Sequence, residues 1–127
     1  PDAVLGGNAT PLQSAAGNRL PLTPDETFNL SVDYRYPLPR GALGLNVTYL
    51  FSSRYVFEPD NIMHQPAYNL VNGTIAWTAP NERFSASLWG RNLTNAVVAN
   101  ALISSSLGSL SEYQPPRTYG VSVEVKF

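Results

Sequence analysis

The sequence predicts an all-β fold: an antiparallel up-and-down meander of about five strands, which forms part of the wall of a transmembrane β-barrel. Five segments alternate between apolar and polar residues, the pattern of a strand with one face in an apolar medium. Short and long connections alternate along the chain, which in a meander places all the short turns at one end. Aromatic residues occupy both ends of the apolar face and aliphatic residues its middle, as in membrane-barrel girdles. No segment has a helical period, so almost no helix is expected.

The chain opens with residues 1–24, which are rich in Pro, Gly, Asn and Ser without sustained periodicity and are expected to form an irregular loop. Residues 25–127 are expected to form the barrel wall. Its strands are predicted near 27–38, 42–52, 67–78, 83–93 and 117–127. Their apolar faces are, in chain order, Phe28, Leu30, Val32, Tyr34, Tyr36 and Leu38; Leu43, Leu45, Val47, Tyr49 and Phe51; Val71, Gly73, Ile75 and Trp77; Phe84, Ala86, Leu88 and Gly90; and Tyr119, Val121, Val123, Val125 and Phe127.

The lengths of the connections indicate which strand ends lie at the same end of the sheet. PLPRG (37–41) and APNE (79–82) are short turns that contain proline, whereas 53–66 and 95–116 are long. The predicted aromatic girdle therefore has Tyr34, Tyr36, Trp77 and Phe84 at the short-turn end, and Phe28, Tyr49 and Phe51 at the long-loop end. A strand of about 10 residues that rises ~3.3 Å per residue and tilts by ~40° spans roughly 25 Å, the height of the apolar band of a barrel.

A soluble β-sandwich is the main structural alternative, because a half-buried sheet shows the same alternation. A sandwich, however, needs a second apolar face on which to pack. Strands of this length in a sandwich rarely carry aromatic residues at both ends and none in the middle. The girdles and the loop asymmetry therefore favour the membrane wall.

Composition excludes several other classes. Charged residues make up 13% of the chain, against ~25% in soluble domains, and the net charge of −1 suggests no nucleic-acid partner. The absence of cysteine excludes disulfides and thiolate metal sites. No apolar run approaches the ~18–20 residues of a membrane helix. The chain starts at Pro1 without a signal peptide, so a fragment of a longer protein is expected.

Four stretches, taken together and in order, resemble the last strands of TonB-dependent outer-membrane receptors. They are GNRLPLTP (17–24), AYNLVNGTIAWTAP (67–80), SLWGRNLTN (87–95) and PPRTYGVSVEVKF (115–127). Each stretch alone is only a weak indication of the family. Four stretches in the family's order, the last of which ends at an aromatic C-terminal residue, are a strong indication. The resemblance covers nearly the whole chain, from about residue 17 onward.

The resemblance implies a barrel of about 22 strands with an N-terminal plug, in the outer membrane of a Gram-negative bacterium. Such receptors import scarce nutrients, such as iron–siderophore complexes, cobalamin or carbohydrates, with energy from the TonB complex through an N-terminal box. This sequence contains no box and no plug, so only the C-terminal strands and the preceding extracellular loop 1–24 are expected. Outer-membrane lipid is then a partner, and no cofactor is implied. An outer-membrane barrel without a plug is the nearest alternative.

The resemblance also gives the last strand a role, because the barrel-assembly machinery of the outer membrane reads a terminal strand that ends in Phe or Trp. The residues that fit this signal are Tyr119, Val121, Val123, Val125 and Phe127. An apolar stripe on an unpaired edge suits strand addition by an assembly factor. The simpler interpretation is that Phe127 is only a girdle residue.

Ligand contacts are expected at the long-loop end and in the upper lumen. The candidates there are Arg54, Tyr55, Glu58, Tyr113 and Arg117, since Arg binds carboxylate or phosphate and Tyr stacks on rings. His64 and Asp60 supply at most two metal ligands, so no metal site is expected. No Ser/His/Asp arrangement or phosphate loop occurs, so the chain is not expected to be an enzyme.

The polar face is expected to line a wet lumen. Five Asn-X-Ser/Thr triplets begin at Asn8, Asn29, Asn46, Asn72 and Asn92. Three of these, Asn29, Asn46 and Asn72, lie in mid-strand, so they are interpreted as luminal amides rather than as glycan acceptors. Asp33 lies on the same face and is expected to pair with an Arg or Lys of a neighbouring strand.

Overall fold

The computed structural model describes residues 14, 16–105 and 108–127, and within them every regular element is a β-strand. These residues belong to two compact units. The sheet unit comprises Phe28–Phe51, Asn69–Ala96 and Pro115–Phe127, and the loop unit comprises the described residues of Pro1–Thr27, Ser52–Tyr68 and Val97–Gln114. No helix in this part of the chain is long and apolar enough to cross a membrane.

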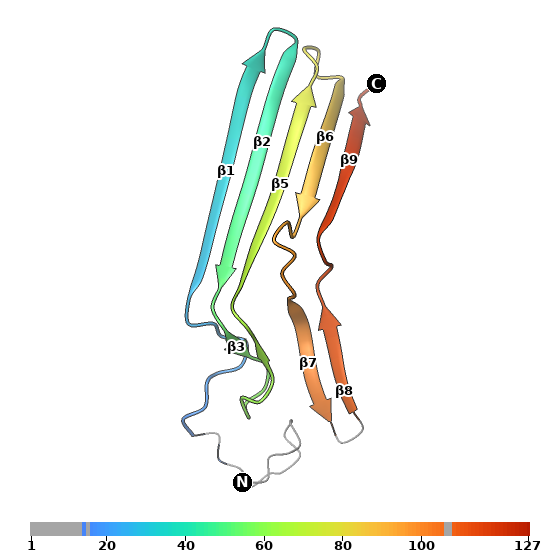
Figure 1. Cartoon of the computed structure of the whole chain (residues 1–127). Coiled ribbons are helices and arrows are strands. Elements are labelled where there is room, and N and C mark those ends of the chain that lie inside the picture. Colours follow the sequence, from blue (N-terminus) through green and yellow to red (C-terminus); the bar gives the residue numbers. More distant parts are fainter. Residues whose placement is uncertain (1–13, 15, 106–107) are drawn as a thin grey trace. The chain divides into compact units, whose positions relative to one another are not determined.

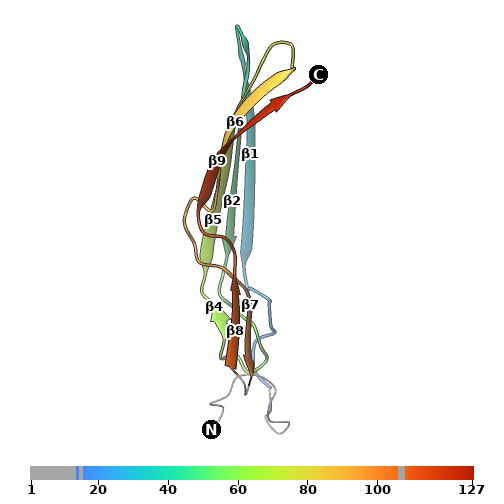
Figure 2. The ribbon, with the colours of Figure 1, turned by 90° about the vertical axis from the view of Figure 1, so that its right-hand side faces the viewer.

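Five long strands form the sheet unit, and they confirm the predicted antiparallel meander. They are β1 (Thr27–Leu38), β2 (Gly41–Ser52), β5 (Tyr68–Thr78), β6 (Phe84–Arg91) and β9 (Thr118–Val125), hydrogen-bonded in the order β1-β2-β5-β6-β9. Figure 1 shows both short turns at one end of this sheet. In the edge-on view of Figure 2 the sheet is a single layer, and β6 and β9 are inclined to β1 at the turn end, as sheet twist requires.

The register aligns apolar residues on one face across neighbouring strands. Ile75 pairs with Leu88, which pairs in turn with Val121, and Ala86 pairs with both Trp77 and Val123. The other face carries pairs such as Ala76 with Ser87 and Thr78 with Ser85. One face of this sheet is therefore apolar and the other polar, as the period of two predicted.

Within the sheet unit, no described residue packs over the apolar face. Among the described residues the only buried apolar side chains are Val56, Val98 and Ala99, and all three belong to the loop unit. Large apolar residues of the sheet stay exposed along every strand, from Leu30 in β1 to Val121 in β9. An exposed apolar surface of this extent marks a face that meets another apolar phase. The described residues lack the second layer that the sandwich alternative requires.

The long connections contain strands that the sequence pattern did not indicate. In the loop unit, β3 (Tyr55–Val56) pairs with β4 (His64–Gln65), and β7 (Ala99–Ser105) pairs with β8 (Gly108–Tyr113). Two-residue strands are too short to show a period. The β7–β8 hairpin also contains a register shift near its base, between Ala99 and Ala101, which interrupts its alternation.

Buried Gln65 links these two hairpins within the loop unit. Its Nε2 donates hydrogen bonds to the carbonyls of Val97, at 3.0 Å, and Pro66, at 3.2 Å, and its Oε1 accepts one from the Ala99 amide at 2.8 Å. The buried side-chain amide thereby has hydrogen-bond partners on both its nitrogen and its oxygen, as its burial requires.

The predicted strand boundaries differ from the observed ones by two residues or fewer. The strand expected near 83–93 ends at Arg91 because Asn92 has a positive φ of 50°, which ends an extended strand. Residues 16–24 contain no strand, and the rest of the expected loop 1–24, except Ser14, lies outside the described residues, as does Asn8.

Trp89 lies on the polar face and is held against β9. Its Nε1 donates a hydrogen bond to Ser122 Oγ at 3.1 Å, and its ring covers Gly120. A Cβ at Gly120 would lie 2.6 Å from Trp89 Cζ2, so only glycine leaves room for the indole. Because Gly120 pairs with Trp89 in the β6–β9 register, the contact favours that register over a shifted one.

Gly120→Ala is therefore expected to destabilise the protein by about 1–3 kcal/mol, because the indole must move and lose its bond to Ser122. Gly44→Ala is the matched control, since a Cβ there would meet only the Ala76 carbonyl oxygen at an ordinary 3.8 Å. Equilibrium urea unfolding of both variants in lipid vesicles measures the difference. Equal costs would show that the Trp89 contact has no energetic role.

Candidate functional site

The polar face of the sheet carries a row of paired side chains. Asn46 Nδ2 donates to Asp33 Oδ1 at 2.6 Å, and Arg35 forms an exposed ion pair with Glu82 at 3.9 Å. The expected pairing of Asp33 with an Arg or Lys is wrong, since its partner is the amide of Asn46. The alternation places Asp33 and Asn46 on the same face of adjacent strands, and at that separation a neutral amide satisfies the carboxylate.

Two hollows lie along this polar face, and both are lined by Asn46 and Thr74. The first, about 420 Å³, is also lined by the small residues Gly44 and Ala76 and by Asp33. The second, about 500 Å³, is lined by the Trp89 indole, Arg91, Asn72 and Ser122. Small side chains and amides leave a surface that water and polar solutes can wet, in keeping with the luminal interpretation of Asn46 and Asn72.

Asn92 is a structural residue that the sequence analysis did not single out beyond its triplet. It is 6% exposed. Its Nδ2 donates to the carbonyls of Ala96, at 2.9 Å, and Pro115, at 3.3 Å, and its Oδ1 accepts from the Ala96 amide at 2.8 Å. The backbone N–H of Asn92 donates to Asn72 Oδ1 at 2.9 Å. The turn after β6 is built on this side chain, and asparagine tolerates its positive φ.

The five ligand-contact candidates are divided between the two units of the chain. Arg54, Tyr55, Glu58 and Tyr113 belong to the loop unit, and Arg117 belongs to the sheet unit. Arg54, Tyr113 and Arg117 are exposed. Among the described residues, no hydrogen bond or ion pair joins the side chains of these three to one another. The candidates were chosen because their side chains suit ligand chemistry and because they lie near the long connections, and neither property determines contact.

Of the five candidates, Tyr55 and Glu58 are the two whose surroundings bear most on ligand binding. The Tyr55 ring lies 5.4 Å from that of Phe57, centroid to centroid. Burial raises the pKa of the Tyr55 phenol, and the charge of Tyr68 and a hydrogen bond to it raise that pKa further. Glu58 Oε2 is buried and accepts no hydrogen bond from the described residues. A buried carboxylate oxygen without a donor is open to a water or to a donor on a ligand.

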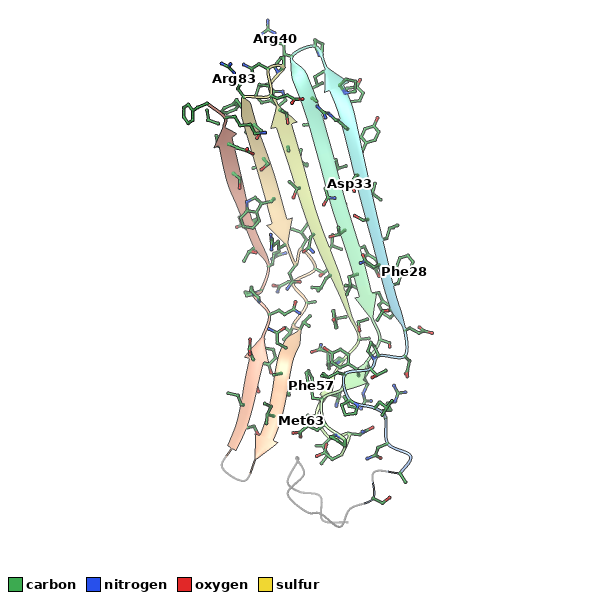
Figure 3. The ribbon with its side chains drawn as sticks, turned by 180° about the vertical axis from the view of Figure 1, so that it is seen from behind. Phe28, Asp33, Arg40, Phe57, Met63 and Arg83 are labelled. Carbon is green, nitrogen blue, oxygen red and sulfur yellow. The ribbon has the colours of Figure 1, made fainter. Side chains whose placement is uncertain are left out.

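A second segment of the loop unit lies against the β3–β4 turn. The Arg19 amide donates to Asn61 Oδ1 at 2.8 Å, and Asn61 Nδ2 donates back to the Arg19 carbonyl at 3.1 Å. Asn18 Nδ2 donates to the Pro59 carbonyl at 2.7 Å. Figure 3 shows Phe57 and Met63 in the same turn. The Phe57 backbone N–H donates a hydrogen bond to the Met63 carbonyl at 2.9 Å. The described part of the N-terminal loop is thus ordered by side-chain amides.

Four of the seven predicted girdle residues form two ring pairs on the apolar face. Phe28 and Tyr49 approach to 6.1 Å, and Trp77 and Phe84 to 6.0 Å, at opposite ends of the sheet. Tyr34 and Tyr36 are exposed in β1, and Phe51 is half-buried in β2. Their role at the membrane boundary remains a prediction.

The residues proposed as an assembly signal form one face of the edge strand β9 or follow it. Tyr119, Val121, Val123 and Val125 are all more than half exposed, and so is Phe127 beyond the strand end. In the described sheet order β9 pairs only with β6, so its outer backbone edge is open to a further strand.

The described residues contain no cluster of side chains suited to a metal ion. They contain no group of three or more His, Cys, Asp or Glu side chains that could hold a metal ion. His64 is exposed, and its Nδ1 lies 3.3 Å from the carbonyl oxygen of Ile62. Asp60 Oδ1 accepts a hydrogen bond from the Ile62 amide at 3.1 Å. Both side chains therefore have local roles in the β3–β4 turn.

Comparison with known proteins identifies this arrangement. Residues 5–93 match the family model described as TonB dependent receptor-like, beta-barrel. The structure is similar to the crystal structure of FyuA, the ferric yersiniabactin uptake receptor of Yersinia pestis, with a TM-score of 0.79 at 23% sequence identity. The similarity covers 89% of this chain and 18% of that receptor, so the chain spans a small part of the receptor's length. At this identity the likeness shows the fold.

Proposed function

The chain belongs to the TonB-dependent receptor-like β-barrel family, and we propose that it is the C-terminal barrel wall of a receptor that imports a scarce nutrient. It is an outer-membrane protein of a Gram-negative bacterium. The family and the similar structure are receptors rather than enzymes. The observation that carries the proposal is the family match over residues 5–93, and the uncovered apolar face of the sheet supports it.

The nutrient classes that suit the proposal are an iron–siderophore complex, cobalamin or a carbohydrate. FyuA takes up ferric yersiniabactin, which supports the first class by fold analogy only. In the loop unit, Tyr55 beside Phe57 offers an aromatic surface, and Glu58 offers a carboxylate oxygen that accepts no hydrogen bond from the described residues. We assign Arg54, Tyr55, Glu58, Tyr113 and Arg117 as the residues to test for ligand contact. Energy would come from the TonB complex through a part of the receptor outside this chain.

We also assign β9 the role of a recognition strand for the barrel-assembly machinery. Its exposed apolar stripe from Tyr119 to Phe127 and its open edge support strand addition. Once paired, the same edge no longer presents free backbone groups, as a membrane barrel requires.

Uptake of labelled nutrients tests the proposed transport function. We expect deletion of the receptor gene to abolish uptake of one of the three nutrient classes. A protonophore should abolish uptake in the wild type as well, because the imported solute moves only with coupled energy. A receptor with Tyr55→Ala and Glu58→Gln should bind that nutrient at least tenfold more weakly, as expected when ~1.4 kcal/mol of contact is lost.

The nutrient that depends on the receptor identifies the ligand class. Uptake that survives the protonophore would contradict energy-coupled import and favour the barrel without a plug. Unchanged binding by the double variant, with normal barrel levels in the membrane, would contradict only the assignment of these two ligand contacts.

A further inference from the structure

The hollow of about 500 Å³ on the polar face contains an indole that is fixed in position. All the residues that line this hollow belong to the sheet unit. Trp89 pairs with Thr74 of β5 and with Gly120 of β9, and it is only half-buried. Its ring covers Gly120, and its Nε1 donates to Ser122 Oγ at 3.1 Å. The part of the indole that does not contact β9 therefore borders the hollow as a rigid apolar surface.

An unpaired arginine lines the same hollow. Arg91 lies two positions after Trp89 in β6, so both side chains are on the polar face, with Cα atoms roughly 6.6 Å apart. Arg91 is exposed, and it forms no ion pair with a described residue. Among the described residues that line the hollow, it alone is charged. The hollow therefore favours an anionic group about one ring length from the indole.

Two side-chain amides in the lining keep part of their hydrogen-bonding capacity. Asn46 Nδ2 donates to Asp33 Oδ1, whereas Asn46 Oδ1 accepts no hydrogen bond from the described residues. Asn72 Oδ1 accepts from the backbone N–H of Asn92, whereas Asn72 Nδ2 donates to no described residue. The first amide therefore offers an acceptor to a ligand, and the second offers donors.

Two hydroxyl groups complete the lining. Ser122 Oγ accepts the hydrogen bond from Trp89 Nε1, so its own proton is still available for donation. Thr74, opposite Trp89 in the β5–β6 register, carries the second hydroxyl. A ligand with several hydroxyl groups suits this mixture of donors and acceptors, because each of its hydroxyls both donates and accepts.

We propose that this hollow binds the pyranose ring of a uronic acid, with the ring on the Trp89 indole and the carboxylate paired with Arg91. The indole offers an apolar surface to the C–H groups of the sugar ring, and a guanidinium donates two parallel hydrogen bonds to a carboxylate. The carboxylate of a uronic acid stands outside the ring, which suits the spacing of roughly 6.6 Å between the two residues. The proposal rests on the proposed import function, within which it names an acidic member of the carbohydrate class.

Other ligand classes use only part of this lining. A cation finds no carboxylate among the described lining residues, since Asp33 lines the other hollow and is bonded to Asn46. A planar aromatic acid stacks on the indole and pairs with Arg91, but it leaves the amides and hydroxyls without partners. A neutral sugar uses those groups and leaves the guanidinium without an anion. The uronic acid accounts for all three features.

Calorimetric titration of the purified complete receptor tests the site, with methyl β-glucuronide as the probe. Methyl β-glucoside, its neutral counterpart, and benzoate are titrated for comparison, and both are expected to bind about fivefold more weakly or worse. Arg91→Gln is expected to weaken glucuronide binding by about tenfold and to leave glucoside binding unchanged, because it removes only the contact with the carboxylate. Trp89→Phe is expected to weaken both sugars alike, because both lose part of the same stacking surface.

Arg83 provides the matched control. It is exposed at the turn end of the sheet, as Figure 3 shows, and it lies opposite Lys126 and outside the lining of the hollow. Arg83→Gln is expected to leave glucuronide affinity unchanged. Equal loss in Arg83→Gln and Arg91→Gln would overturn the proposal, because binding would then follow net charge. Wild-type affinity in Arg91→Gln would overturn it too, and so would benzoate or glucoside binding as tight as that of the glucuronide.

The titration separates this site from the import function, because it needs no uptake. Absence of glucuronide binding by a receptor whose gene deletion abolishes uptake of a nutrient would overturn the site and leave import standing. Glucuronide binding that depends on Arg91, by a receptor whose deletion changes no uptake, would support the site and overturn import.

Discussion

Arginine in place of Leu88 is expected to destabilise the barrel wall by about 2–4 kcal/mol, the cost of a basic side chain near the middle of a lipid-facing strand. Leu88 lies between Ile75 and Val121 on the apolar face and is 60% exposed. No protein side chain covers that exposed part. In the outer membrane the new guanidinium must therefore reach the interface or remain in hydrocarbon, and either adjustment lowers the free energy of unfolding.

The neighbouring residue supplies the control for this prediction. Ser87 pairs with Ala76 and Ser122 on the polar face, so Ser87→Arg is expected to cost less than about 1 kcal/mol. Equilibrium urea unfolding of the complete receptor in lipid vesicles measures both variants. The two variants introduce the same residue at neighbouring positions of β6, so they differ only in the face of the sheet that receives the charge. A larger cost at Ser87 than at Leu88 would contradict the assignment of the apolar face to lipid.

Replacement of Asn92 by Leu is expected to cost about 3–4 kcal/mol. The substitution removes side-chain hydrogen bonds to Ala96 and Pro115, each worth roughly 1 kcal/mol net, and leaves their backbone groups without these partners in a partly buried turn. It also forces a side chain without a local hydrogen bond into a positive φ. Unfolding free energy in vesicles is again the measurement.

Two further variants separate the causes at Asn92. Asn92→Gly accepts the positive φ without strain but lacks the amide, so it is expected to recover only the conformational part of the loss. Asn95→Gly is the matched control, because Asn95 has a φ of 54° but is exposed and its Oδ1 accepts only the Arg117 amide at 3.3 Å. That variant is expected to lose about 1 kcal/mol or less. Similar losses at the two asparagines would show that burial of Asn92 has no special effect.

The candidate site was only partly predictable. Tyr55 and Glu58 were chosen because their side chains suit ligand chemistry and lie in a long connection. The buried, unpartnered oxygen of Glu58 and the approach of the Tyr55 and Phe57 rings depend on how that connection folds. The expected partner of Asp33 was wrong for a related reason. Charge indicates that a carboxylate will be paired, but cross-strand register decides that the nearest donor is Asn46.

The sequence by itself determined the five long strands of the sheet, their antiparallel order along the chain and the identity of the apolar face. A period of two and the alternation of short and long connections are local properties, and they depend only on neighbours in the chain. Only the tertiary structure decided that Gln65 links two hairpins, that Asn92 builds the turn after β6 and that Trp89 covers Gly120. Each of these contacts joins segments through hydrogen bonds or van der Waals contact across strands. A residue's type indicates that it can make such a contact, but the partner is set by register and by the path of the intervening chain.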